Sequence, residues 1–157
     1  MSKFNLRKFL KVSYEIILPI LQFSIIILHF IKLEFFPNIE IIRVNFIYSF
    51  LGFLIIIIAT MIMLISINEL GPNLSPFPRP RPKGNLITSG IYSFVRHPMY
   101  YSLILISFGV FITNLTLYFL FLTITLGLII KLKIKLEEQY LHNKFQNYFL
   151  YKDKVKY

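Results

Sequence analysis

Long uncharged apolar stretches dominate the chain, and short polar segments separate them. The first stretch runs from about Val12 to Ile31 and the second from about Val44 to Ile67. Each has about the 20 residues that a helix needs to cross the hydrocarbon core of a bilayer. Gly71 and Pro72 follow the second stretch, where a helix is expected to stop. The pattern predicts two membrane-spanning helices, over about residues 12–31 and 44–67.

The third apolar region is too long for a single crossing. The 34 residues from His97 to Ile130 contain no Lys, Arg, Asp or Glu. As one helix they would extend about 51 Å, whereas the hydrocarbon core is only about 30 Å thick. The region therefore forms either one very long helix or two shorter helices that turn near residues 111–116. Asn114 is a candidate cap for a second helix that begins at this turn.

The distribution of basic residues favours two helices. Of the 17 Lys and Arg residues, 15 lie in residues 1–11, in the loop over 68–98, or from residue 131 onward. Four spans place these three segments on one side, which the positive-inside rule identifies as cytoplasmic. We therefore expect an all-α, multi-pass integral membrane domain over residues 1–157, with both termini cytoplasmic. Its last two spans, about 99–112 and 115–134, would form a tight hairpin before a helical cytoplasmic tail over 135–157.

Composition supports a membrane protein and excludes several other classes. The chain is 56% apolar yet carries a net charge of +10, a combination that disfavours a soluble domain and intrinsic disorder. It has no Cys and only three scattered His residues, so we expect neither a disulfide framework nor a metal site. The basic excess fits the anionic headgroups of a lipid bilayer better than nucleic acid.

The loop after the second span contains the first candidate functional motif. Prolines alternate with other residues from Pro76 to Pro82, which predicts an extended, polyproline-like surface segment. Arg96, His97 and Pro98 then begin the third apolar region, and Pro98 suits the first turn of a helix. The free N–H groups of that turn, with Arg96 and His97, would form an anion site. The alternative is that Arg96 and His97 only anchor the helix at the interface.

The second candidate motif follows the last apolar stretch. Glu137 and Glu138 are adjacent, and His142 lies four residues after Glu138 on the same helical face. Helical spacing would pair Lys133 with Glu137, and Lys135 with Glu138, each pair contributing only a few tenths of a kcal/mol. Adjacent carboxylates near lipid are costly unless they bind a ligand or face water. The glutamates therefore either hold ribose hydroxyls or an ammonium group, or belong to a solvated helix face.

Together the two motifs resemble the isoprenylcysteine carboxyl methyltransferase and phospholipid methyltransferase superfamily, across about residues 68–157. The resemblance rests on Gly90-x-Tyr92-x-x-x-Arg96-His97-Pro98-x-Tyr100, the membrane hairpin, Glu137-Glu138 and Phe145-x-x-Tyr148-x-x-Tyr151. It implies an S-adenosylmethionine-dependent integral membrane enzyme. The cofactor-binding residues it implies are Tyr92, His97, Pro98, Tyr100, Glu137, Glu138 and His142. His97, Arg96 and Glu138 would be catalytic.

The resemblance also implies an acceptor of a particular kind. It would be a lipidic or prenylated molecule that enters from the bilayer and reacts at the cytoplasmic interface, with carboxyl O-methylation as one form of the reaction. Ser102 stands where the family often has Gly, and the chain lacks the additional spans of the larger eukaryotic enzymes. Two alternatives stay open: an NADPH-dependent reductase of the sterol-reductase type, and a non-catalytic membrane scaffold. The sequence does not specify an oligomeric state.

Overall fold

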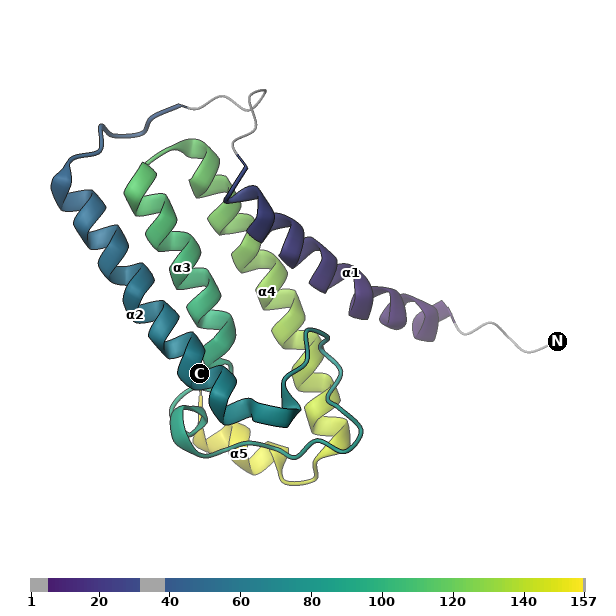
Figure 1. The fold of residues 1–157 in the computed structure, drawn as a ribbon. Helices are drawn as coiled ribbons and strands as arrows, with labels where there is room; N and C mark the ends of the chain where they lie inside the picture. The colour runs from purple at the N-terminus through teal and green to yellow at the C-terminus, as the bar shows by residue number, and fades with distance from the viewer. Residues whose placement is uncertain (1–5, 32–38, 157) are drawn as a thin grey trace.

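The protein is helical, as its sequence predicts. The computed structural model describes residues 6–31 and 39–156, and within these ranges it contains no strand beyond a single bridge between Glu40 and Thr116. Figure 1 shows the five α-helices in chain order. They are α1 (Leu6–Leu28), α2 (Phe46–Leu70), α3 (Pro98–Asn114), α4 (Leu117–Lys144) and α5 (Tyr148–Lys154). Two 3₁₀ helices, η1 (Gly71–Asn73) and η2 (Gly90–Ser93), lie in the loop between α2 and α3.

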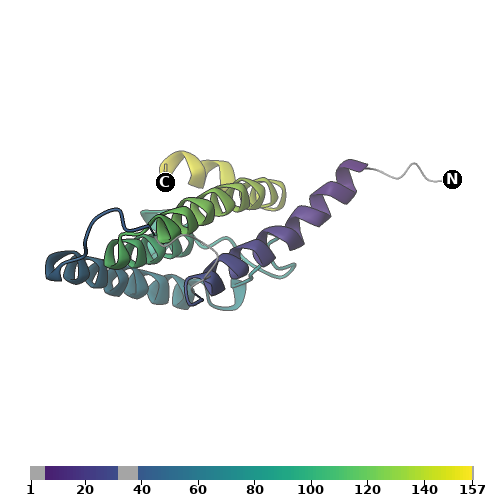
Figure 2. The ribbon, with the colours of Figure 1, turned by 90° about the horizontal axis from the view of Figure 1, so that it is seen from above.

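Helices α2, α3 and α4 run side by side and antiparallel, with α3 in the middle (Figure 1). The C-terminal half of α1 packs against α4, and the N-terminal half of α1 diverges from the bundle, as Figure 2 shows from above. The loop over residues 71–97, the last turns of α4 and α5 gather at one end of the bundle. This polar end contains both of the motifs that the sequence identifies.

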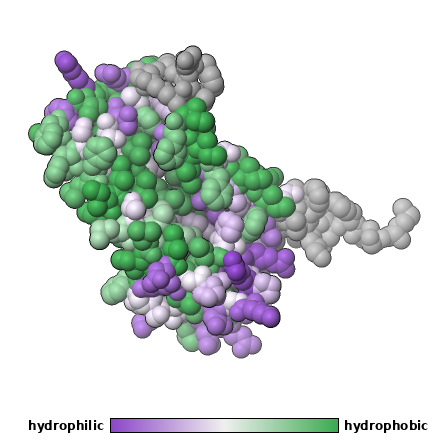
Figure 3. All heavy atoms as spheres, in the orientation of Figure 1, coloured by the Kyte–Doolittle hydropathy of each residue, from purple (hydrophilic) through white to green (hydrophobic). Residues whose placement is uncertain are grey.

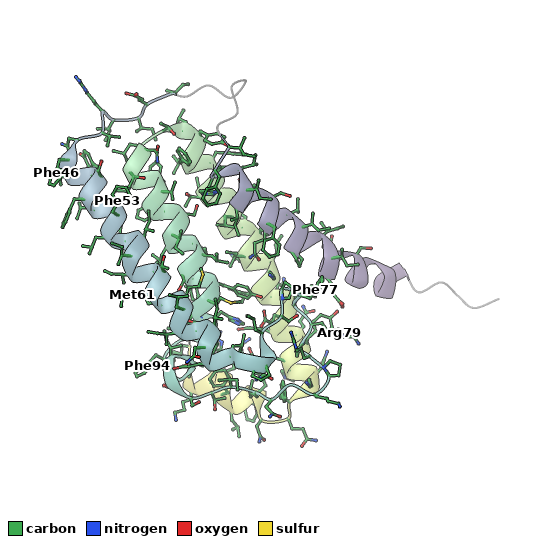
Figure 4. The ribbon with its side chains drawn as sticks, viewed as in Figure 1. Phe46, Phe53, Met61, Phe77, Arg79 and Phe94 are labelled. Carbon is green, nitrogen blue, oxygen red and sulfur yellow. The ribbon has the colours of Figure 1, made fainter. Side chains whose placement is uncertain are left out.

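The sides of the bundle are strongly apolar. Helix α2 with η1 (Phe46–Asn73) and helix α4 (Leu117–Lys144) are long and apolar enough to cross a membrane, and Ser13–Leu28 and Pro98–Asn114 are shorter apolar helices. Phe46, Phe53 and Met61 project from α2 with more than half of each side chain exposed (Figure 4). The hydrophobic surface covers the middle of the molecule, with hydrophilic residues toward its two ends (Figure 3). This distribution is typical of a protein surrounded by lipid.

Helices α2 and α3 approach closely because glycines face each other across their interface. A Cβ atom added at Gly52 would meet Thr113 and the backbone of Gly109, and one added at Gly109 would meet Ile56 and the backbone of Gly52. Small residues that let two backbones approach are the usual basis of tight helix packing in membranes. The close contact joins the first turns of α2 to the last turns of α3, at the end of the bundle away from the polar loop.

The hairpin between α3 and α4 agrees with the two-helix alternative, but its cap differs from the predicted one. Asn114 is the last residue of α3, and Leu115 takes a left-handed conformation with φ of 46°. Thr116, rather than Asn114, caps α4 by accepting a hydrogen bond from the Phe119 N–H. Asn114 instead donates its side-chain amide back to the Val110 carbonyl. Its side chain therefore completes the first helix and does not begin the second.

One other prediction needs correction. Residues 76–79 form a series of bends, so the proline-rich segment curves around the polar end and does not extend straight. The tail is helical as predicted, because α4 continues to Lys144 and a separate short helix, α5, follows it. Tyr148 and Tyr151 of α5 are buried against Leu141 and Leu86, which fixes α5 on the polar end.

Candidate functional site

A cavity of about 760 Å³, including its open mouth, occupies the polar end of the bundle. The proline-rich loop forms one wall, while the start of α3, the polar end of α4 and α5 form the others. The residues from the sequence motifs that line it are Tyr92, Arg96, His97, Tyr100, Glu137, Phe145 and Tyr151.

His97 provides a buried nitrogen beside the cavity. The residue precedes Pro98, which occupies the first turn of α3 as predicted, and its ring stacks on Tyr100 with centroids 5.7 Å apart. Only 6% of His97 is exposed. Its Nε2 lies 3.5 Å from Glu138 Oε1, but it has no hydrogen-bond partner of ordinary geometry in the described part of the chain. His97 thus lines the cavity while this nitrogen faces the Glu138 carboxylate.

Tyr100 and Glu137 bring the two motifs together. The Tyr100 hydroxyl, on the first turn of α3, donates a hydrogen bond of 2.6 Å to Glu137 Oε2 on α4. Both residues line the cavity, and no Lys, Arg or His side chain forms an ion pair with Glu137 within the described ranges. The carboxylate therefore keeps acceptor capacity for hydroxyl or ammonium groups of a bound molecule.

Glu138 has a different environment from its neighbour. Arg96 Nε donates 3.0 Å to its Oε1, Arg96 Nη2 forms an ion pair with the same oxygen at 3.0 Å, and Lys152 donates to its Oε2 at 2.7 Å. The facing His97 imidazole, followed by Lys152 and Arg96, holds the pKa of Glu138 well below its usual range despite partial burial. Arg96 Nη1 also donates to the Val155 carbonyl. Glu138 thus joins α3, α4 and the segment after α5 as a permanently charged group.

The 3₁₀ helix η2 positions Tyr92 at the cavity. Gly90 has a φ of 58°, and the Ile91 N–H donates 2.8 Å to Glu69 Oε2 at the end of α2. The Tyr92 hydroxyl donates 3.3 Å to the Ser66 carbonyl, while its own carbonyl accepts 2.6 Å from the Tyr151 hydroxyl. Burial raises the pKa of Tyr151 to about 12, so this phenol stays protonated and can donate. The loop is therefore fixed to both α2 and α5.

The structure separates the predicted site residues into two groups. Tyr92, Arg96, His97, Tyr100 and Glu137 line the cavity. Pro98, Glu138 and His142 do not: Pro98 is buried at the start of α3, while Glu138 and exposed His142 line a separate shallow groove with Lys135 and Tyr148. The Arg96 guanidinium is also not free to bind an anion as predicted, because it already donates to Glu138 and to backbone carbonyls.

Helix α1 supplies the partner of Lys133, which the helical spacing had paired with Glu137. Lys133 does not pair with Glu137: its Nζ donates 2.7 Å to Gln22 Oε1 on α1 and lies 5.0 Å from the centroid of the Tyr100 ring. Lys133 is only 2% exposed. Its position in a run of alternating lysines resembled a solvated face. Gln22, which lies in the apolar C-terminal half of α1, was a sequence signal that could have indicated its partner.

Comparison with known protein families assigns this arrangement. The family model for phospholipid methyltransferases matches residues 47–148, which is more than half of the chain and covers α2 through the end of α4. The chain belongs to the phospholipid methyltransferase family. Membership of this family indicates a membrane methyltransferase and confirms the resemblance seen in the sequence. No curated protein and no solved structure matched the chain. Helix α1, with Gln22 and Glu15, lies outside the part that the family model matches.

Proposed function

We propose that the protein transfers a methyl group from S-adenosylmethionine to a lipidic or amphiphilic acceptor at the cytoplasmic face of a membrane. The observation that supports this function best is the lining of the cavity, where His97 stacks on Tyr100 beside the Tyr100–Glu137 pair. A cofactor with a nucleoside and an amino acid part needs hydroxyl and ammonium partners, and these residues fit that need.

The residues of the cavity have distinct roles in this proposal. Glu137 accepts hydrogen bonds from ribose hydroxyls or the ammonium group, with Tyr100 holding its carboxylate in place. Tyr92 supplies an aromatic wall, and the imidazole of His97 adds a polar group to the lining. Glu138 is a positioning residue, because it contacts Arg96, His97 and Lys152 rather than the cavity. His142 has no role in this arrangement, since its exposed side chain lies in the neighbouring groove.

The reaction needs little chemistry from the protein itself. S-adenosylmethionine, when bound, supplies a methyl group that its sulfonium already activates. Catalysis by the chain then consists mainly of alignment and exclusion of water. A carboxylate acceptor needs no general base, which is why carboxyl O-methylation is one form of the proposal. For an acceptor that must lose a proton, His97 is the base that lines the cavity.

Membrane placement follows from the apolar surface and the basic residues. We propose that α1 to α4 all cross the bilayer, with the polar end and both termini on the cytoplasmic side. The acceptor reaches the cavity laterally from the bilayer, since the cavity lies at the end of uninterrupted apolar helices. Reporter fusions after Lys83, Asn114 and residue 157 test the topology: cytoplasmic signals at 83 and 157 with an external signal at 114 agree with it. An external signal at 157 would contradict it.

Calorimetry of the purified protein in detergent tests the cofactor. S-adenosylhomocysteine should bind, NADPH should not, and His97→Ala or Glu137→Gln should weaken binding about 10- to 150-fold, the loss expected for a hydrogen bond to a charged group. Binding of NADPH instead would indicate the reductase alternative, and binding of neither the scaffold. Transfer of a labelled methyl group into native lipid extract, with identification of the product, then identifies the acceptor.

A further inference from the structure

A second groove lies on the other side of the proline-rich loop from the cavity. Glu15 of α1, the segment over residues 75–82 and the last turns of α4 line it. The two spaces share a wall, because Ser75, Phe77, Arg79, Pro80 and Arg81 line both of them. In Figure 4, Phe77 and Arg79 lie where the loop passes between α4 and the diverging half of α1.

The groove is positively charged. Its lining contains Arg79, Arg81 and Lys144 against a single carboxylate, Glu15. Glu15 accepts a hydrogen bond from the Tyr140 hydroxyl, and Lys144 donates to the carbonyls of Arg81 and Gly84. In the described ranges, neither guanidinium forms a hydrogen bond or an ion pair. Arginine forks of this kind match the oxygens of phosphate groups.

Apolar side chains beside these cations indicate an amphiphilic ligand. Phe77 lines the groove and is 48% exposed, and Pro80 and Pro82 lie on the same wall. On α1, Ile16 and Ile20 follow Glu15 with at least half of each side chain exposed. A free phosphate ion would gain nothing from these apolar groups, whereas the headgroup and upper chain of a lipid would contact both kinds of surface.

We propose that this groove binds the phosphate-bearing headgroup of an anionic bilayer lipid through Arg79 and Arg81, with Phe77 in the interfacial region. The site is distinct from the cofactor cavity and does not depend on methyl transfer. Since the two spaces share a wall, a lipid in the groove also fixes the loop that covers the cavity.

Native mass spectrometry of the full chain in neutral detergent tests the proposal with a short-chain probe, dihexanoyl phosphatidylglycerol. Arg79→Gln and Arg81→Gln should each weaken binding about fivefold, the effect of one basic residue at an anionic surface. Lys154→Gln and Lys131→Gln remove exposed cations outside the groove and should change the affinity little. Equal weakening in these control variants would show that only the overall charge matters, and would overturn the site.

Two further probes identify the source of the phosphate. Dihexanoyl phosphatidylcholine should bind more weakly than the anionic lipid, and glycerol phosphate, which has no chains, more weakly still. Equal binding of the choline lipid would contradict an anionic site, and equal binding of glycerol phosphate would contradict an amphiphilic one. Calorimetry with S-adenosylhomocysteine on the same samples separates this proposal from the proposed function. If the wild type does not bind S-adenosylhomocysteine, the proposed function fails but the lipid measurements still stand. If the wild type binds S-adenosylhomocysteine but not the anionic lipid, only the lipid site fails.

Discussion

Lys133 on α4 donates a 2.7 Å hydrogen bond to Gln22 on α1, and both residues are buried. Helix α1 lies outside the part of the chain that the family model matches. The contact joins this helix to Lys133, whose ammonium group lies over the Tyr100 ring. An ammonium group held in an apolar bundle by one amide and one aromatic ring depends strongly on each of them. The contact therefore determines how α1 is placed against the rest of the molecule.

Gln22→Leu should lower the free energy of unfolding by about 3 kcal/mol, because it leaves the Lys133 ammonium buried with one partner fewer. Lys133→Met combined with Gln22→Leu should recover most of this loss, since two apolar residues then pack together. Thermal unfolding in detergent, followed by circular dichroism, measures both. A double variant that is less stable than Gln22→Leu alone would show that the lysine does not depend on the glutamine.

Gly90→Ala should destabilise the loop before α3. Gly90 has a φ of 58°, and a Cβ atom there would meet the Glu69 carboxylate, so we expect a loss of at least about 1–2 kcal/mol. Gly127→Ala is the matched control, because a Cβ atom at Gly127 on α4 would meet nothing. Its stability should stay the same or rise slightly. Equal loss of stability in both variants would contradict a specific role for the Gly90 turn.

The sequence was sufficient to predict the helical class and the start of α3, because both depend on local patterns. Charge-free apolar stretches set the helices, and proline after His97 marked the start of α3. The turn lies within the predicted residues 111–116, but the residue that caps α4 was misjudged by two positions. Asn and Thr are both good caps, and only the left-handed backbone at Leu115 makes Thr116 the residue that precedes α4.

The candidate site was harder to predict, since its geometry depends on contacts between distant segments. The motifs located His97, Tyr100 and Glu137, which line one cavity. Adjacent residues on a helix point in directions about 100° apart, so Glu137 faces the cavity while Glu138 faces Arg96 and Lys152. The bend of the proline-rich loop, which brings Arg79 and Arg81 to the cavity wall, has no comparable signal in the spacing of its prolines.

Glu138 makes a testable contribution to the dependence of stability on pH. Its pKa in the folded protein lies below the unfolded value of about 4.3. Its stabilising contribution is therefore complete above the unfolded pKa and is lost as the pH falls toward the folded one.

Melting temperatures measured from pH 6 down to about pH 3 should fall less steeply for Glu138→Gln than for the wild type. Asp153→Asn, at an exposed position on α5, is the control and should follow the wild type. Parallel curves for Glu138→Gln and the wild type would show that Arg96, His97 and Lys152 do not hold the carboxylate charged.

Tyr100→Phe tests whether the hydrogen bond between α3 and α4 holds the cofactor-binding carboxylate in place. The change removes only the hydroxyl that donates 2.6 Å to Glu137, and it keeps the ring that stacks on His97 and lies beneath Lys133. A charge-assisted hydrogen bond of this kind contributes about 1.5–3 kcal/mol. If Glu137 binds the cofactor only in the orientation that Tyr100 gives it, S-adenosylhomocysteine should bind about 10-fold more weakly or worse.

The neighbouring Tyr101 provides the matched control for this prediction, because it is exposed on the outer side of α3 and does not line the cavity. Tyr101→Phe should bind S-adenosylhomocysteine like the wild type in the same calorimetric titration. Thermal unfolding of both variants separates a local effect from a general loss of structure. Glu137→Gln in the Tyr100→Phe background should add little further loss, since the two residues act as one unit. Fully additive losses would mean that Tyr100 contacts the cofactor independently of Glu137.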